Sequence, residues 1–168
     1  MNDWFLSQFP FTFVKLNYLK LMAKDRYHFI VKEALINEGW KITHDPFPLR
    51  DWDPDWEIDL GAEKVFGAEK DNQKIAVEVK SFLETSFAYE FHKTLGQYLN
   101  YLASLSQLEK ERTLYLAVPL NVWETDFQRK GIQFSIKTYN IKIIVYNIIK
   151  LLYNNYIQYV KYSFSSIY

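Results

Sequence analysis

The residue types best suited to chemistry are an acid and a lysine one position apart, in Glu78-Val79-Lys80. The apolar run around them, residues 74–80, has the composition of a β-strand. Alternate residues of a strand point to the same side, so Glu78 and Lys80 are expected to face one way and Val77 and Val79 the other. A carboxylate and an ammonium are costly to place in an apolar strand unless they pair or bind something.

A second carboxylate precedes this strand, because Asp59 lies in a short strand-like run, residues 57–60. Mg²⁺ takes oxygen ligands and keeps several waters, so one or two carboxylates can hold it against a phosphate. Asp59 and Glu78 are therefore candidate ligands for Mg²⁺ or Mn²⁺, and Lys80 is placed to orient or deprotonate a metal-bound water. The pattern indicates a metal-dependent nuclease site. The alternative interpretation is a cross-strand salt bridge at a sheet edge.

The composition is that of one globular domain, since the chain has 168 residues, of which 49% are hydrophobic and 18% aromatic. There is no cysteine, which excludes disulfides, thiolate catalysis and cysteine-based metal centres and is typical of a reducing cytoplasm. The three histidines lack metal-ligand spacing and are interpreted as core or surface residues: His28, His44 and His92.

Charge is unevenly distributed along the chain, although the net charge is zero. Residues 51–71 are rich in acids, whereas no acid follows Asp126. The basic residues beyond that point are Arg129, Lys130, Lys137, Lys142, Lys150 and Lys161. An acidic metal-binding centre beside a basic flank suits binding to a phosphate backbone. The alternative is a solvated acidic loop and an unrelated basic tail.

The two ends differ in composition from the middle of the chain. Residues 1–21 are aromatic and apolar, without helical or strand periodicity and without the features of a signal peptide or a spanning helix. They are interpreted as a spurious extension, because the sequence from Met22 resembles a protein start. Residues 147–168 are interpreted as an atypical tail, with an amphipathic helix as the alternative. The folded domain is expected to span residues 22–146.

The middle of the chain predicts an α/β fold. One helix is expected from an N-cap at Asp25 to Gly39, and a longer one over residues 87–108. Further expected elements are strands within residues 40–43, 58–70, 74–80, 112–118 and 141–146, and a short helix over 122–131. A turn at residues 71–73 predicts a hairpin, and the intervening helices predict parallel pairing of the later strands. The expected architecture is a mixed β-sheet flanked by helices.

This order of elements, with Asp59 and the Glu78-Val79-Lys80 triplet in central strands, resembles the PD-(D/E)xK nuclease superfamily. The proline that usually precedes the aspartate is replaced by Ile58. The resemblance implies a restriction-endonuclease-like fold and a divalent-metal site.

The same resemblance implies additional site residues. Glu33, in the first helix, matches an acid that many members add to the site, and Glu63 is an alternative source of a ligand or supporting contact. Gln97 follows the triplet in the long helix, where Gln97-x-x-x-Tyr101 is similar to an element of RecB-type nucleases. In this interpretation Gln97 positions the triplet.

The chain also resembles the XisH family, the cyanobacterial fdxN-element excision-controlling factors. The segments that carry this resemblance are Met22-Ala23-Lys24-Asp25, residues 58–63, residues 75–82, Leu95-Gly96-Gln97-Tyr98 and residues 114–119. The family implies a role in developmentally controlled excision of a DNA element, together with a separate site-specific recombinase and a small partner, XisI. Association with a membrane is not expected.

Two functions remain open at this point. The first is a metal-dependent DNA endonuclease or nicking enzyme, which the intact Asp59, Glu78 and Lys80 favour. The second is a catalytically silent DNA-binding accessory subunit, which is favoured because the recombinase of an excision system exchanges the strands. A third class is a toxin–antitoxin-like partner of XisI. Fold alone does not separate these functions.

Overall fold

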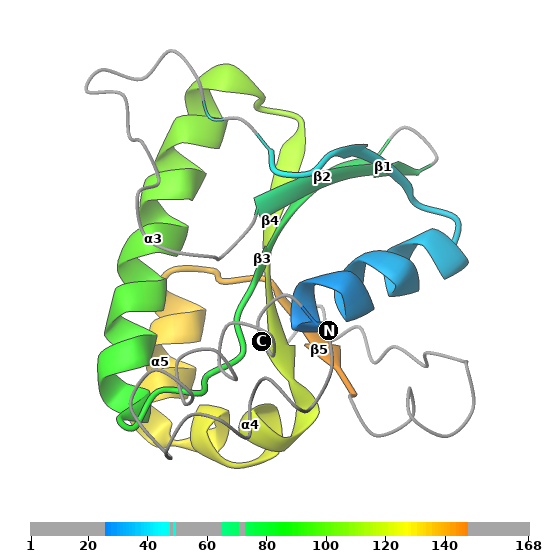
Figure 1. Cartoon of the computed structure of the whole chain (residues 1–168). Coiled ribbons are helices and arrows are strands. Elements are labelled where there is room, and N and C mark those ends of the chain that lie inside the picture. Colours follow the sequence, from blue (N-terminus) through cyan, green and yellow to red (C-terminus); the bar gives the residue numbers. More distant parts are fainter. Residues whose placement is uncertain (1–25, 48, 50–64, 71–72, 148–168) are drawn as a thin grey trace, which may run out of the picture.

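The computed structural model describes residues 26–47, 49, 65–70 and 73–147, and within these ranges helices cover both faces of a five-stranded sheet (Figure 1). A helix over residues 26–37 comes first. The elements that follow are β1 (Lys41–His44), β2 (Val65–Lys70), β3 (Gln73–Val79), α3 (Phe87–Leu108), β4 (Arg112–Pro119), α4 (Leu120–Glu124), the 3₁₀ turn η1 (Asp126–Gln128), α5 (Lys130–Thr138) and β5 (Ile143–Tyr146).

The sheet is mixed, and its spatial order is β1-β2-β3-β4-β5. β1, β2 and β3 pair antiparallel, whereas β3, β4 and β5 pair parallel. Parallel neighbours need a crossover, which α3 supplies between β3 and β4, and the α4–α5 segment between β4 and β5. The predicted hairpin, the parallel pairing and the helix-flanked mixed sheet are therefore confirmed. β3 is the central strand.

The first helix ends, and α3 begins and ends, where the sequence predicts, whereas the predicted N-cap of the first helix, Asp25, lies outside the described residues. Gly39, with φ of 86°, takes the left-handed conformation that ends the first helix. At the start of α3, the backbone N–H of Tyr89 donates to Oγ of Ser86 at 3.3 Å, which makes Ser86 the N-cap. In the described part of the chain, no helix combines the length and apolarity needed to cross a bilayer.

The connection between β4 and β5 differs from the prediction of one short helix over residues 122–131. α4 ends at Glu124, η1 follows, and α5 starts only at Lys130. Two side-chain amides bond carbonyl oxygens where the helices break: Gln128 Nε2 donates to Trp123 O at 2.8 Å, and Gln133 Nε2 to Phe127 O at 2.7 Å. These hydrogen bonds satisfy backbone carbonyl oxygens that a continuous helix would have paired. The apolar periodicity of the sequence does not reveal such side-chain bonds.

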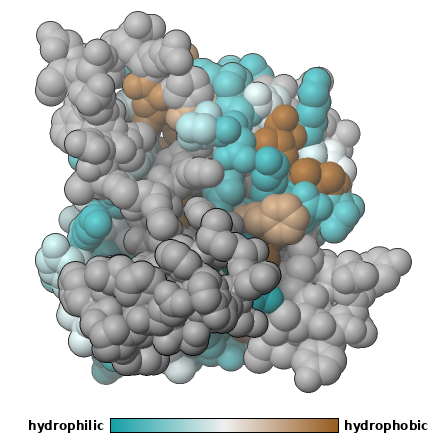
Figure 2. Space-filling model, viewed as in Figure 1, coloured by the Kyte–Doolittle hydropathy of each residue, from teal (hydrophilic) through white to brown (hydrophobic). Residues whose placement is uncertain are grey.

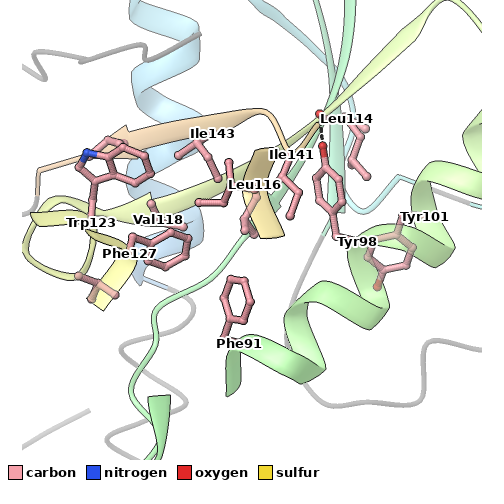
Figure 3. Close-up of a cluster of buried hydrophobic side chains, with 14 of the residues drawn as sticks. Phe91, Tyr98, Tyr101, Leu114, Leu116, Val118, Trp123, Phe127, Ile141 and Ile143 are labelled. Atoms are coloured by element: carbon pink, nitrogen blue, oxygen red, sulfur yellow. Dashed lines mark hydrogen bonds between the residues drawn. The ribbon is translucent and has the colours of Figure 1, made fainter. Parts of the chain in front are cut away.

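The core has one cluster on each face of the sheet. The helix over residues 26–37 contributes Ile30, Val31 and Leu35, which pack with side chains of β3 and β5, namely Ile75, Val77, Val79, Ile144 and Tyr146. On the other face, α3 and η1 pack against β4 and β5, as Figure 3 shows for Phe91, Tyr98, Leu116, Phe127 and Ile143. Phe127 is fully buried and contacts the rings of Phe82, Phe87, Phe91 and Trp123.

The outer surface of the first helix mixes polar and apolar side chains, among them the exposed Phe29 and Ile36. In the coloured part of the face in Figure 2, hydrophobic side chains over this helix form small patches separated by hydrophilic ones. Isolated exposed apolar residues are normal for a globular protein.

Tyr98 links α3 to β4 and to the residue that precedes β5 through its hydroxyl. The hydroxyl donates to the carbonyl oxygen of Leu114 at 3.0 Å, drawn as a dashed line in Figure 3, and accepts from the backbone N–H of Lys142 at 3.2 Å. Tyr98→Phe is expected to lower the free energy of unfolding by about 1–3 kcal/mol, because it leaves a buried backbone group without a partner. Urea denaturation measures this loss. Tyr115→Phe, at a half-buried tyrosine, is the control. An equal loss of free energy of unfolding in both variants would contradict the stabilising role of the Tyr98 hydroxyl.

Candidate functional site

The triplet lies at the C-terminal end of the central strand, with its charged side chains turned away from the first helix. Val77 and Val79 pack in the cluster beneath that helix, while Ala76, on the other face, packs with α3. Glu78 shares the face of Ala76, as the alternation of a strand requires. The expected separation of charged and apolar residues is therefore present.

Glu78 and Lys80 form a buried ion pair. The side chain of Glu78 is 0% exposed and that of Lys80 is 1% exposed, and Lys80 Nζ lies 2.9 Å from Glu78 Oε1. The alternative interpretation, a cross-strand pair at a sheet edge, is wrong in its position, because both residues belong to the region of the central strand and lie two positions apart. An exposed ion pair contributes little to the stability of a fold. The contribution of a buried ion pair depends strongly on the groups that surround it.

α3 supplies two further groups to this pair. Lys80 Nζ donates to Gln97 Oε1 at 2.8 Å, so the ammonium lies between the carboxylate and the amide. Tyr101 is one helical turn beyond Gln97. Burial, and secondarily the nearby charge of Glu78, raises the pKa of the Tyr101 hydroxyl. The structure thus brings Glu78, Lys80, Gln97 and Tyr101 together.

The carboxylate of Glu78 is incompletely satisfied. Within the described part of the chain neither of its oxygens accepts a hydrogen bond, since the approach of Lys80 Nζ to Oε1 is close in distance but not aligned as one. Burial raises the pKa of Glu78 to about 8. Buried polar groups without hydrogen bonds are rare in folded proteins. A buried carboxylate whose oxygens accept no hydrogen bond from the described residues fits a site that accepts a cation in addition to Lys80.

The backbone of Lys80 forms hydrogen bonds with β4 and β5. Its N–H donates to Ala117 O of β4 at 3.0 Å, and its carbonyl oxygen accepts from the Tyr146 hydroxyl of β5 at 3.0 Å. Sequence reasoning missed Tyr146, because a tyrosine in an apolar strand carries no signal beyond burial. Together these bonds hold the lysine in register where β3 ends.

The chain turns sharply after Lys80. Phe82 has φ of 52°, a left-handed conformation that is uncommon for a residue with a side chain. The neighbouring Ser81 is buried, and its Oγ has no hydrogen-bond partner within the described residues. Strained backbone and unpaired polar atoms tend to gather at functional sites.

The described part of the structure does not place the other predicted site residues beside Glu78 and Lys80. Asp59 and Glu63 lie outside the described residues, as do most of the acidic segment and both chain ends. Glu33 is half-buried on the first helix, whose inward side packs against the opposite face of the sheet from Glu78. Among the described residues, no three His, Asp or Glu side chains cluster as metal ligands. The roles of Asp59, Glu63 and Glu33 stay predictions.

The comparison with protein families agrees with the resemblance seen in the motifs. The family model described as XisH protein matches residues 21–152. The chain belongs to the XisH family. No curated protein matches it.

Two solved structures show what this XisH protein is similar to. One is described as an fdxN element excision controlling factor protein from Anabaena variabilis, with 39% identity, a TM-score of 0.68, and coverage of 82% of this chain and 99% of that one. The other is an XisH family protein from Nostoc punctiforme, with 37% identity, a TM-score of 0.66, and coverage of 80% and 98%. The predicted family membership is confirmed.

Proposed function

We propose that this XisH protein is a Mg²⁺- or Mn²⁺-dependent DNA nuclease with a restriction-endonuclease-like fold, and that it acts in excision of a DNA element. The observation that carries the proposal is the fully buried Glu78 carboxylate, which accepts no hydrogen bond from the described residues and lies beside Lys80 and Gln97. A purely structural buried ion pair is stable only when further hydrogen bonds satisfy the remaining carboxylate lone pairs. A cation site instead keeps those lone pairs available for the ion.

Each residue has a distinct role in this proposal. Glu78 would hold the ion together with Asp59, and Glu63 or Glu33 would add a ligand or a supporting contact. A bound divalent ion lowers the pKa of a coordinated water and stabilises charge on the phosphate. Gln97 accepts a hydrogen bond from Lys80 at 2.8 Å, so the ammonium keeps a partner when Glu78 turns to the ion. Lys80 would orient the attacking water and add positive charge near the phosphate.

The relatives support the proposed cellular role. The Anabaena variabilis protein is described as controlling excision of the fdxN element, which makes DNA the natural substrate class for this family member. An XisI-like protein and a site-specific recombinase are the proposed partners in that process. The nuclease would then cut or nick DNA in support of a strand exchange that the recombinase performs.

The second candidate function is a DNA-binding accessory subunit that does not cut. One observation favours it: the Lys80 ammonium already neutralises Glu78 at 2.9 Å, as a purely structural pair would. In that case the site is inherited from a nuclease fold and retained for stability.

A cleavage assay on supercoiled plasmid separates the two functions. With Mg²⁺ or Mn²⁺ the wild-type protein is expected to nick or linearise the plasmid, and Glu78→Gln and Asp59→Asn are each expected to slow the reaction by at least about a hundredfold. Glu124→Gln, at an exposed carboxylate, is the matched control and should cut like the wild type. If the wild-type protein binds the plasmid but leaves it intact with either ion, the accessory function holds.

A further inference from the structure

The outward face of α5 is both basic and aromatic. Ile132 and Ile136 point inward and pack against the core cluster beneath α3. Lys130, Phe134 and Lys137 follow at helical spacing on the opposite side and are exposed. Phe134 is 72% exposed, so it contributes almost nothing to the core. The fold itself therefore gives no reason for a phenylalanine between two lysines.

The charge on this face is not neutralised. Arg129, which precedes the helix, is paired with Asp126 at 2.5 Å and lies over the ring of Phe87 at 5.6 Å. Lys130 and Lys137, by contrast, form no ion pair with any described residue. No acid follows Asp126 in the sequence, so the segment that continues into β5 adds only positive charge, including the exposed Lys142.

We propose that this face binds single-stranded DNA, with Lys130 and Lys137 on phosphates and Phe134 stacked on an unpaired base. The inference rests on the proposed function of the chain as a protein that acts on DNA. Lysines supply the backbone contacts, and an exposed aromatic ring supplies a stacking surface that tolerates any base. An intact duplex keeps its bases stacked on one another and offers Phe134 no free base face.

A protein partner fits this face less well. The apolar area consists of one ring between charged side chains, whereas stable protein interfaces have larger, charge-depleted centres. Single-stranded DNA, a polyanion with aromatic bases, matches both the positive charge of the lysines and the exposed ring. Unpaired strands also arise wherever DNA is nicked or exchanged, which is the setting of the proposed function.

The face is connected to the candidate site through α3. The backbone N–H of Lys142, between α5 and β5, donates to the hydroxyl of Tyr98 at 3.2 Å. Tyr98 is the neighbour of Gln97, which binds Lys80. The segment that carries the basic face is thus attached to the same helix that completes the site.

Fluorescence anisotropy with a short, mixed-sequence, labelled single-stranded oligonucleotide tests this inference. The titrations contain a chelator, so that no cleavage can occur. Phe134→Ala is expected to weaken binding by about tenfold. Lys130→Gln/Lys137→Gln is expected to reduce the slope of log affinity against log salt by about 1.4, because two phosphate contacts are lost.

Matched controls carry the same changes elsewhere on the surface. Phe29→Ala removes an exposed ring, 59% exposed, from the helix on the opposite sheet face. Lys41→Gln/Lys110→Gln removes two exposed lysines outside α5. Both should bind like the wild type. If the α5 variants bind as these controls do, the surface assignment is overturned while the proposed DNA function stands. If the wild-type protein binds no DNA, both fail.

Discussion

Saturating Mg²⁺ is expected to raise the melting temperature of the wild-type protein, and Glu78→Gln is expected to abolish the rise. A buried carboxylate that accepts no hydrogen bond gains a partner when the ion binds, and a ligand that binds only the folded state stabilises it by mass action. At about 100 times its Kd the ion contributes roughly 2.7 kcal/mol. For a chain of this size that corresponds to a shift of roughly 5–10 °C.

Differential scanning fluorimetry with Mg²⁺, Mn²⁺ or chelator measures this shift. The experiment belongs above pH 8, because the pKa of Glu78 is raised to about 8 and the protonated acid does not bind a cation. Asp59→Asn is expected to behave like Glu78→Gln, and the exposed Glu124→Gln like the wild type. A metal-dependent rise that survives in the Glu78→Gln protein would place the ion elsewhere on the molecule.

Lys80→Met is expected to lower the free energy of unfolding by about 3–5 kcal/mol at high pH, because it leaves the Glu78 carboxylate buried without its cation. Near pH 4.5 the loss should be much smaller. There Glu78 is uncharged in the folded protein, and the variant contains no unpaired buried charge. Urea unfolding of the variant and the wild type across this pH range measures the difference.

The sign of the pH dependence follows from the raised pKa of Glu78. Burial raises it from 4.5 to about 8, so between these values the folded state binds more protons than the unfolded state. The stabilising contribution of the uncharged acid is fully present below pH 4.5 and is lost as the pH rises through about 8. Removing the Lys80 ammonium favours the uncharged acid further, which extends the loss of stability to higher pH.

Glu78→Gln serves as the control for this titration. A glutamine does not ionise, so the free energy of unfolding of this variant should depend less on pH over the same range than that of the wild type. The interpretation fails if Lys80→Met costs the same near pH 4.5 as near pH 8, because the cost would then come from lost packing and not from an unpaired charge.

Local chemistry in the sequence was sufficient to predict most of the elements. The strand with Glu78, the helix ended by Gly39 and the long helix after the triplet depend on neighbours a few residues away, and all three were predicted correctly. The two faces of β3 also follow from local geometry, because side chains of a strand alternate. α5 was missed, since only Ile132 and Ile136 face the core and Phe134 points to solvent, which leaves too weak a helical pattern.

The sequence by itself therefore determined the family, the mixed sheet and the charged pair on one face of its central strand. The tertiary structure decided how deeply that pair is buried, and which groups reach it. Gln97 lies 17 positions from Lys80, and Tyr146, whose hydroxyl binds the Lys80 carbonyl, lies 66 positions away. Such contacts depend on strand order and on how α3 packs over the sheet, and a periodic sequence pattern contains neither. The same packing keeps water from Glu78, and this exclusion of water is the physical reason that its carboxyl pKa is raised.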